Sequence, residues 1–398
     1  MPYLGGVFSS IFSTVFIMFL IMTIGYLVGA ISVKGISLGT AGVLLVAIIY
    51  GIVASKNPSF NIGGVGINLF NDAIKSRFSM VSSIGTAMFV TAVGLIAGPK
   101  FFRSLNKSFL KYIFMGIIII GIGGLVTLGF IAIDPNLEPE MAVGLMTGAL
   151  TSTPGLSAAQ EVAGEASDLV TTGYGIAYLF GVLGVVFFVQ LMPRILGANM
   201  EEEVKKFVAA DTVKIVESDR KLFNIESMGF FTFAFAIALG CIIGAIKIPG
   251  INFSLGNSGG CLLAGMIVSH FGHIGNISLK IEKNVLNFIR ELGLGFFLIG
   301  AGVPGGVNFV ANIKLSYFLY GVVMTLVPMI LGFFLAKYVF KVDLLNALGS
   351  ITGGMTSTPA LGALIHTAGT DDVAAAYAAT YPVALVCVVL VAKLIILL

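Results

Sequence analysis

Charged residues are scarce in this chain. Only 10% of its 398 residues are Asp, Glu, Lys or Arg, whereas 57% are hydrophobic. Soluble domains carry roughly 25% charged residues, so this composition cannot cover a water-facing globule. The shortage of charge excludes a nucleic-acid binder, a disordered protein and an ordinary cytosolic enzyme. We therefore expect an all-α, polytopic membrane protein, in which each span needs about 20 apolar residues.

Cysteine and histidine are also sparse. Cys241, Cys261 and Cys387 each lie inside an apolar stretch, which argues against disulfides and a metal cluster. The three histidines are too scattered to predict a metal site. No charge precedes Lys34, so the first apolar stretch has no basic leader region and a cleavable signal peptide is not expected. Residues 7–31 are predicted to form a retained first span.

Glycine, in contrast, is abundant: the 51 glycines suggest close helix packing and broken helices. Charge-free windows predict the membrane segments. They are 4–33, 35–55, 79–98, 112–133, 141–160, 169–193, 227–246, 250–279, 292–313, 315–336, 344–370 and 373–392. The windows 141–160 and 344–370 each contain a Thr-Ser-Thr-Pro run, which would be costly in a lipid-facing helix. We interpret these two as re-entrant or discontinuous, which leaves ten full spans.

The basic residues predict an orientation. With both termini outside the cytoplasm and five crossings on each side of a cytoplasmic central loop, sixteen Lys and Arg residues face the cytoplasm and six, including Lys393, face the other side. This bias follows the positive-inside rule. The predicted domains are a membrane repeat over 1–196, a short cytoplasmic linker over 197–226 and a second membrane repeat over 227–398.

An internal duplication is the most informative feature of the sequence. The stretch Gly148–Leu156 recurs as Gly353–Leu361, 205 residues later. Other landmarks recur in the same order, with offsets between 217 and 203: Gly25, Gly29, Gly39, Gly42, Gly85, Phe89, Gly94, Gly98, Phe101, Tyr112, Gly116, Tyr174 and Tyr178 match Gly240, Gly244, Gly256, Gly259, Gly293, Phe297, Gly302, Gly306, Phe309, Tyr317, Gly321, Tyr377 and Tyr381. Because each repeat holds five crossings, the halves must be inverted relative to each other. Inverted repeats with broken segments in corresponding places point to a secondary transporter whose site lies where the breaks meet, although a duplication can also build a channel or a sensor.

The two polar runs are the candidate substrate site. Proline suits the first turn of a helix and Ser or Thr suits its N-cap, so each run is predicted to mark a return into helix at Pro154 and Pro359. The freed N–H groups and the positive helix end favour an anion. The substrate-binding candidates are Thr151, Ser152, Thr153, Pro154, Thr356, Ser357, Thr358 and Pro359. Two such tips could hold a substrate with two carboxylates; the alternative is that the hydroxyls only cap buried helix ends.

Further polar and small residues have two interpretations each. Seven residues are expected either to line the pathway or to serve helix packing: Gly148, Gly353, Gly354, Tyr174, Tyr178, Tyr377 and Tyr381. The acidic and amide residues after the motifs are expected in solvated connections, with a gate or cation role as the alternative: Gln160, Glu161, Glu165, Asp168, Asp371 and Asp372. His270 is expected at the membrane interface or as a proton-sensitive group. Arg290 and Glu291 are expected to pair at the interface.

The paired Gly-x-x-Thr-Ser-Thr-Pro-x-Leu signature, together with Leu38–Gly42 and Leu255–Gly259, resembles the aspartate–alanine exchanger family of bacterial transporters. The resemblance implies a carrier of the bacterial cytoplasmic (inner) membrane with two inverted repeats, a homodimer, and an elevator-like movement. It implies small carboxylates as substrates, such as aspartate, alanine or a dicarboxylate of the succinate type. Many relatives insert large TrkA-type C-terminal domains between the repeats, and this chain has only about 30 residues there, from Arg194 to Glu226.

Three functions remain after this reasoning. The leading one is exchange or export of small carboxylates, and the second is their uptake coupled to Na⁺ or H⁺. An ion channel is the more remote alternative. An enzyme is not expected, and no residue is predicted to be catalytic, because neither motif places a nucleophile beside a histidine or a carboxylate pair. No cofactor or bound metal is expected, apart from the open question of a coupling Na⁺ or H⁺.

Overall fold

The computed structural model is almost entirely helical. It describes residues 13–33, 36–37, 39–62, 65–103, 110–198, 203, 222–248, 253–307, 309–370 and 373–398. Its helices are α2 (Thr14–Ala30), α3 (Ala41–Lys56), α4 (Asp72–Arg103), α5 (Leu110–Ile133), α6 (Pro139–Ala149), α7 (Thr153–Ala163), α8 (Ser167–Ile195), α10 (Phe230–Ala245), α11 (Gly256–Phe271), α12 (Lys283–Val307), α13 (Phe309–Asn312), α14 (Leu315–Phe334), α15 (Leu344–Gly354), α16 (Thr358–Ala368) and α17 (Ala374–Leu397). Most of the predicted linker lies outside the described residues.

Every predicted full span corresponds to a helix, but not every such helix is long enough to cross a bilayer. Six described segments have the length and composition of a span: Asp72–Pro99, Leu110–Ile133, Thr153–Ile195, Lys283–Val307, Leu315–Val339 and Ala374–Leu397. Helices α2, α3, α10 and α11 have only 16 or 17 residues, or about 24–26 Å at 1.5 Å per residue. Six of the ten predicted spans thus have the length of a span among the described residues, and the other four correspond to these shorter helices. The windows 4–33, 35–55 and 250–279 also include residues that form hairpins.

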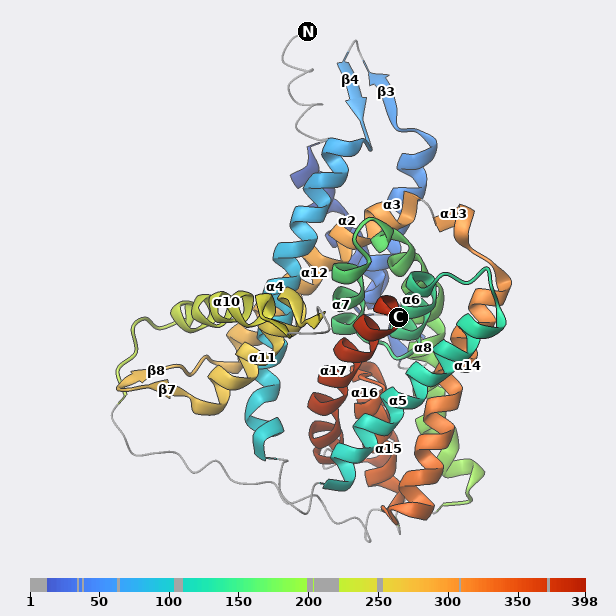
Figure 1. Ribbon diagram of the computed structural model, residues 1–398, viewed down its shortest axis with the longest axis vertical. Helices are drawn as coiled ribbons and strands as arrows, with labels where there is room; N and C mark the ends of the chain where they lie inside the picture. Colours follow the sequence, from blue (N-terminus) through green and yellow to red (C-terminus); the bar gives the residue numbers. More distant parts are fainter. Residues whose placement is uncertain are drawn as a thin grey trace.

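Four short antiparallel hairpins accompany the helices, which the all-α prediction did not include. They are β1 (Ser32–Val33) with β2 (Ile36–Ser37), β3 (Ser59–Ile62) with β4 (Val65–Asn68), β5 (Lys247–Ile248) with β6 (Phe253–Ser254), and β7 (His273–Ile274) with β8 (Ile277–Ser278). The first joins α2 to α3, and the third joins α10 to α11 at the corresponding place of the duplication. The β3–β4 hairpin extends beyond the top of the bundle in Figure 1.

The helices pack as two groups. One contains α2, α3, α4, α10, α11 and α12, and the other contains α5 to α8 and α14 to α17. Figure 1 shows α10 and α11 projecting on the left, with most of the second group on the lower right. Within each group, every helix of the first half has a partner of the second: α4 packs on α11 and α12, α12 on α3, α5 on α17, and α8 on α14. The two halves of the chain are thus interleaved and do not form separate lobes.

Glycines make the closest of these crossings, as the composition predicted. A Cβ on Gly85 of α4 would lie 2.3 Å from the Phe297 backbone nitrogen, and one on Gly293 of α12 would lie 2.6 Å from the Phe89 backbone nitrogen. Since Gly85 matches Gly293 and Phe89 matches Phe297 in the duplication, the contact between α4 and α12 is reciprocal. Only residues without a side chain allow two backbones to approach this closely.

One proposed pair of landmarks is wrong by one residue. A Cβ on Gly42 would meet the backbone of Gly25 and Gly29, and in the second half it is Gly260 that meets Gly240 and Gly244 in this way. Gly259 instead faces the side chains of Leu255 and Val389. The counterpart of Gly42 is therefore Gly260, and the packing of the short helix pair, rather than the sequence spacing, identifies it.

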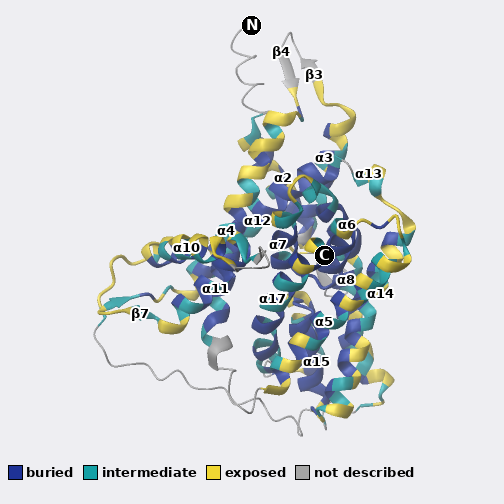
Figure 2. Ribbon diagram, viewed as in Figure 1, coloured by how far each residue is buried: buried dark blue, intermediate teal, exposed yellow. Residues whose placement is uncertain are grey.

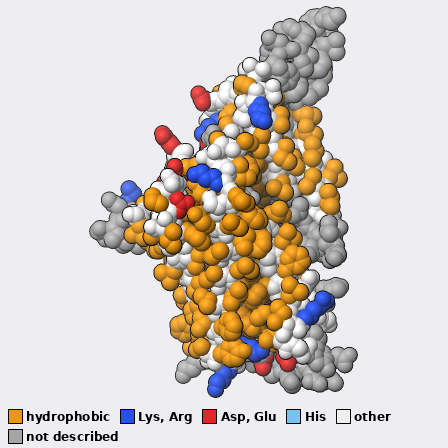
Figure 3. Space-filling model, turned by 90° about the vertical axis from the view of Figure 1, so that its right-hand side faces the viewer, with side chains coloured by type: hydrophobic (Ala, Val, Ile, Leu, Met, Phe, Trp, Pro, Cys, Tyr) orange, Lys and Arg blue, Asp and Glu red, His pale blue; other side chains and the backbone are white. Residues whose placement is uncertain are grey.

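The distribution of hydrophobic residues is that of a membrane protein. Figure 2 shows that much of the ribbon of the second group belongs to buried residues. Large apolar side chains such as Leu27, Leu125 and Ile195 are nevertheless 68%, 70% and 72% exposed. Figure 3 shows hydrophobic side chains over most of one face, with charged ones near the lower edge and on the upper part. In α5 apolar residues surround the whole helix, which is typical of a helix in lipid. The chain is a multi-pass membrane protein.

Candidate functional site

The two Thr-Ser-Thr-Pro runs break two helices at matching points, as predicted. Helix α6 ends at Ala149 and α7 begins at Thr153, while α15 ends at Gly354 and α16 begins at Thr358. The N-caps are Ser152 and Ser357, both with φ of −97°, and each proline lies in the first turn. The cap is one residue earlier than the threonine that precedes proline. Ser152 Oγ accepts a hydrogen bond from the Gly155 N–H at 3.3 Å, whereas the buried Ser357 hydroxyl has no hydrogen-bond partner among the described residues.

The two breaks meet and bind each other reciprocally. The Thr151 hydroxyl donates to the Met355 carbonyl at 2.9 Å, and the Thr356 hydroxyl donates to the Leu150 carbonyl at 2.9 Å. Both threonines adopt left-handed backbone conformations, with φ of 53° and 50°, which cost roughly 1–2 kcal/mol per non-glycine residue. The crossed hydrogen bonds hold these conformations in place. Residues 205 apart in sequence thus form one junction.

The conserved geometry of the duplication extends to the neighbouring glycines and tyrosines. A Cβ on Gly148 would lie 2.5 Å from the Tyr174 carbonyl oxygen, and one on Gly353 would lie 2.8 Å from the Tyr377 carbonyl oxygen. A Cβ on Gly354 would instead meet the side chain of Ile119 in α5, at 2.4 Å. Gly148 thus allows α6 to pack closely on α8, and Gly353 allows α15 to pack closely on α17.

The tyrosines form two matching pairs. The Tyr174 and Tyr178 rings lie 4.9 Å apart and the Tyr377 and Tyr381 rings lie 5.0 Å apart. Tyr174 shares a hydrogen bond with Thr153 at 3.3 Å, and Tyr377 shares one with Thr358 at 3.2 Å. In each pair the first tyrosine therefore positions a motif hydroxyl.

The junction forms one wall of a cavity of about 530 Å³ between the two helix groups. This volume lies within the range of roughly 300–1,000 Å³ that small-molecule sites occupy. Its lining includes Thr151, Thr153, Pro154, Tyr178, Thr356, Thr358, Pro359 and Tyr381 from the second group, and Tyr26, Thr40, Phe89, Arg290 and Glu291 from the first. The cavity brings six of the eight predicted substrate-binding residues together. Ser152 and Ser357 are fully buried and do not line it.

Arg290 and Glu291 supply the charges of this cavity. The Arg290 guanidinium donates to the Glu291 carboxylate at 2.8 Å, and the two side chains are 34% and 41% exposed. The sequence predicted their pairing, but it placed them at the membrane interface. They lie within α12, on the wall opposite the junction. Their adjacency in the sequence gave no sign of which other helices surround them.

A second cavity of about 230 Å³ occupies the corresponding place on the other side of the α4–α12 crossing. Ser82, Ser83 and Thr86 of α4 line it, at the positions that the 208-residue offset pairs with Arg290, Glu291 and Leu294 of the first cavity. Asn257 stands there in place of Thr40. The two cavities are thus equivalent by the duplication, but the arginine–glutamate pair is present only in the first.

We expected the polar residues after the first motif in solvated connections, but three of them make contacts between helices. Glu161 pairs with Lys393 at 3.0 Å, Asp168 pairs with Lys75 at 2.9 Å, and the Gln160 amide donates to the Thr171 hydroxyl at 2.6 Å. Glu165 is exposed, as expected, and Asp371 and Asp372 lie outside the described residues. Lys393 is only 1% exposed within α17, so it does not belong to the charges of a loop. If Lys393 and the cavity residue Arg290 are left out of the count, fifteen Lys and Arg residues remain on the predicted cytoplasmic side and five on the other side. The bias therefore keeps its direction.

Among the described residues no group of three or more His, Cys, Asp and Glu is arranged to hold a metal ion. Cys241 is exposed, Cys261 is buried and Cys387 is half-buried, all as free thiols. His270 is exposed at the end of α11, where its ring lies 5.3 Å from that of Phe271.

Residues 17–194 and 232–397 match the family described as the predicted permease membrane region of the Asp-Al_Ex type. The chain belongs to the aspartate–alanine exchanger family. It is 25% identical to an uncharacterized transporter of Bacteroides fragilis, with 95% of this chain and 97% of that protein covered. It is 24% identical to an uncharacterized transporter of Desulfotalea psychrophila, with 96% of each chain covered. These alignments extend over 538 and 548 positions, so the relatives contain many residues that this chain of 398 lacks. Because the family consists of permeases, the expectation that the chain is not an enzyme is confirmed.

Proposed function

We propose that the protein is a secondary carrier of small carboxylates, either an exchanger or an exporter. The observation that carries the proposal is the first cavity, where both helix breaks and one arginine face a common space between two helix groups. The family and its transporter relatives support a transport role. The nature of the substrate is argued from the cavity's chemistry.

The cavity offers suitable partners for a carboxylate. Helices α7 and α16 both begin at its wall, and the positive ends of their dipoles favour negative charge. Arg290 presents a planar fork of donors that matches a carboxylate in two hydrogen bonds. Thr153 and Thr358 add hydroxyls, whereas Thr151 and Thr356 are engaged in joining the two breaks. Glu291 would pair with a substrate ammonium group, so the cavity favours an amino acid such as aspartate over a dicarboxylate such as succinate.

The transport mechanism that fits this arrangement is alternating access by an elevator-like movement. The supporting observations are the reciprocal contacts of the duplicated elements, the division of the helices into two groups, and the two cavities along the border between these groups. In this proposal residues 1–196 and 227–398 are inverted repeats, residues 197–226 are a cytoplasmic linker, and α5–α8 with α14–α17 move as one body. The carrier would operate as a homodimer in a bacterial inner membrane with both termini outside the cytoplasm.

Counterflow in proteoliposomes tests this function. Vesicles loaded with aspartate, alanine or succinate should accumulate labelled aspartate from outside, and vesicles loaded with the neutral amide propionamide should not. An imposed Na⁺ or H⁺ gradient distinguishes exchange, which it leaves unchanged, from coupled uptake, which it drives. Flux that does not saturate with substrate would instead indicate a channel.

Replacing the cavity arginine tests the substrate class. The Arg290→Lys change keeps the charge but removes the fork of donors, and a charge-assisted hydrogen bond contributes roughly 1.5–3 kcal/mol. We expect Kd for aspartate, measured by isothermal titration, to rise about tenfold or more, since 1.4 kcal/mol is a factor of ten. Arg77→Lys is the matched control, because Arg77 is exposed, does not line the first cavity and donates to the Thr14 hydroxyl at 3.3 Å. Equal affinity in both variants would reject Arg290 as the carboxylate partner.

A further inference from the structure

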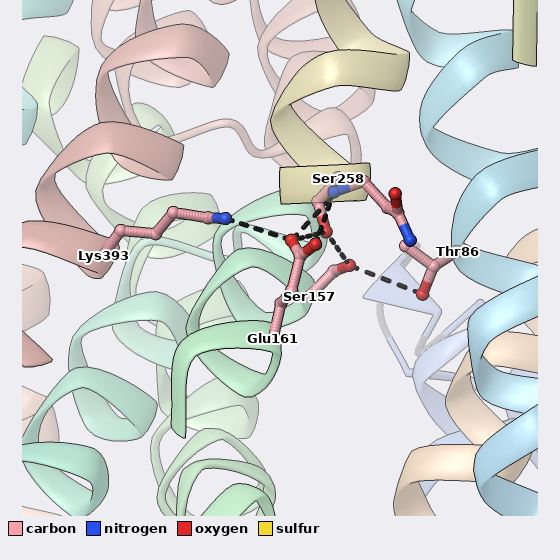
Figure 4. Close-up of polar contacts among 6 residues, drawn as sticks. Thr86, Ser157, Glu161, Ser258 and Lys393 are labelled. Atoms are coloured by element: carbon pink, nitrogen blue, oxygen red, sulfur yellow. Dashed lines mark hydrogen bonds and ion pairs between the residues drawn. The ribbon is translucent and has the colours of Figure 1, made fainter. Parts of the chain in front are cut away.

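Glu161 connects the two helix groups beside the second cavity. It extends from α7, in the group that contains both helix breaks, to the beginning of α11 in the other group (Figure 4). Its carboxylate accepts a short hydrogen bond from the Asn257 backbone N–H. It also accepts hydrogen bonds from the Ser258 N–H at 3.4 Å and from the Ser258 hydroxyl at 3.2 Å. The carboxylate therefore caps α11, where a negative charge is stabilised by the helix dipole.

Hydroxyl groups extend this contact into the border between the groups. The Ser157 hydroxyl of α7 lies 2.9 Å from the Ser258 hydroxyl of α11, and it donates to the Thr86 hydroxyl of α4 at 3.4 Å. Figure 4 shows these side chains converging from α7, α11 and α4, with Lys393 reaching Glu161 from the opposite side. The network thus holds α7 against two helices of the other group.

Lys393 forms an ion pair with Glu161. Its ammonium is almost fully buried and lies 3.0 Å from the Glu161 carboxylate. A buried charge is costly unless it is paired, so the two must remain together. Both residues belong to the group that contains the breaks. If that group moves, the ion pair moves with it, and only the hydrogen bonds to α11 are broken.

The corresponding positions of the other half carry different residues. At the positions that correspond through the duplication, His366 replaces Glu161 at an offset of 205, and Gln190 replaces Lys393 at an offset of 203. The sequence therefore does not repeat this acid–lysine combination. The second cavity, beside Glu161, has less than half the volume of the first, about 230 Å³ against about 530 Å³.

We propose that Glu161 is a positioning residue that holds α7 against α11 and so keeps the second cavity narrow while the first is wide. Its release from α11 lets the second cavity widen as the first narrows. The inference rests on the proposed alternating access, but it concerns the resting position of the carrier and does not depend on the substrate.

Cysteine labelling of the purified protein measures this position directly. In a background with Cys241, Cys261 and Cys387 replaced by alanine, one reporter is placed in each cavity: Thr40→Cys in the first and Ser83→Cys in the second. In the Glu161→Gln variant we expect faster maleimide labelling of the second-cavity reporter and slower labelling of the first. The ratio of the two rates should change by about tenfold, the effect of losing one charge-assisted hydrogen bond. Glu165→Gln is the control. Glu165 is an exposed acid four residues after Glu161, and its replacement should leave the ratio unchanged.

Opposite changes at the two reporters distinguish a change of position from a loosened structure. If both reporters label faster and the melting temperature falls, Glu161 only stabilises the fold, and the proposal is rejected. An unchanged ratio rejects it as well. If Glu161→Gln does not fold, Ser258→Ala removes part of the same contact from α11 and should shift the ratio in the same direction by a smaller amount. Because no substrate is added, a shifted ratio without carboxylate transport would reject the proposed function alone.

Discussion

At the scale of single residues, the junction of the two breaks is the decisive feature. Thr151 and Thr356 combine an unfavourable backbone conformation with a side chain that ties each break to the other. Glycine would adopt this conformation without strain, yet it could not make the crossed hydrogen bonds. The first hydroxyl of each motif therefore serves the architecture, and the third, Thr153 or Thr358, is left to face the cavity beside a tyrosine.

Removing the crossed hydroxyls should destabilise the junction without changing its shape. Thr151→Val and Thr356→Val each leave a buried carbonyl without its donor, which costs about 1–3 kcal/mol. We expect both single variants to melt at lower temperature in detergent. The double variant should lose less free energy of unfolding than the two single variants lose together, because the first substitution already loosens the junction. Thr23→Val is the control, since its hydroxyl bonds to Phe19 of its own helix at an exposed position; strict additivity would contradict a coupled junction.

At the scale of elements, the duplication appears as pairs of contacts and not as two similar halves. The short helices α2 and α3 pack through glycines in the same way as α10 and α11, and α4 and α12 cross at matching glycines. The start of α11 nevertheless differs from that of α3, because Glu161 occupies it. Gly256 has φ of +65° and faces that carboxylate, whereas Gly39 has φ of +54° and faces open space.

This pair of glycines provides a matched comparison. Gly39→Ala should cost only the backbone strain, about 1–2 kcal/mol. Gly256→Ala has the same strain, and its Cβ would lie 2.3 Å from the Glu161 carboxylate, so we expect it to lower the melting temperature further. In a Glu161→Ala background the two substitutions should become similar. A difference that persists there would show that Glu161 is not the cause of the crowding.

At the scale of the whole molecule, two groups of interleaved helices meet along two cavities. Most close contacts lie within a group, and the contacts between groups include small polar side chains such as Ser157, Ser258 and Thr86. The border also holds apolar contacts, because Phe89 and Leu262 of the first group cluster with Ala158, Leu385 and Val389 of the second. The proposed elevator-like movement requires these contacts to be exchanged.

Linking the groups should stop transport while leaving binding intact. In the cysteine-free background, Ser157→Cys and Ser258→Cys replace hydroxyls that lie 2.9 Å apart, so the two thiols are placed to form a disulfide. We expect oxidation to reduce counterflow by at least tenfold and a reductant to restore it, with aspartate affinity unchanged. Each single cysteine variant should be insensitive to the oxidant. Undiminished counterflow after complete cross-linking would rule out movement between these groups.

The sequence by itself determined the membrane class, the positions of the helices and the two breaks, because these follow from local composition, proline and the length of apolar runs. It also identified the duplication and the part of the cavity lining that the two motifs and their tyrosines contribute. Only the tertiary structure decided which of those residues meet. The position of Arg290 and Glu291 in the cavity with the two breaks, the Glu161–Lys393 pair and the true counterpart of Gly42 all depend on helices brought together from distant parts of the chain. Some of the scarce charges therefore lie in pairs at the border between the groups, and the almost fully buried Lys393 depends on its partner Glu161.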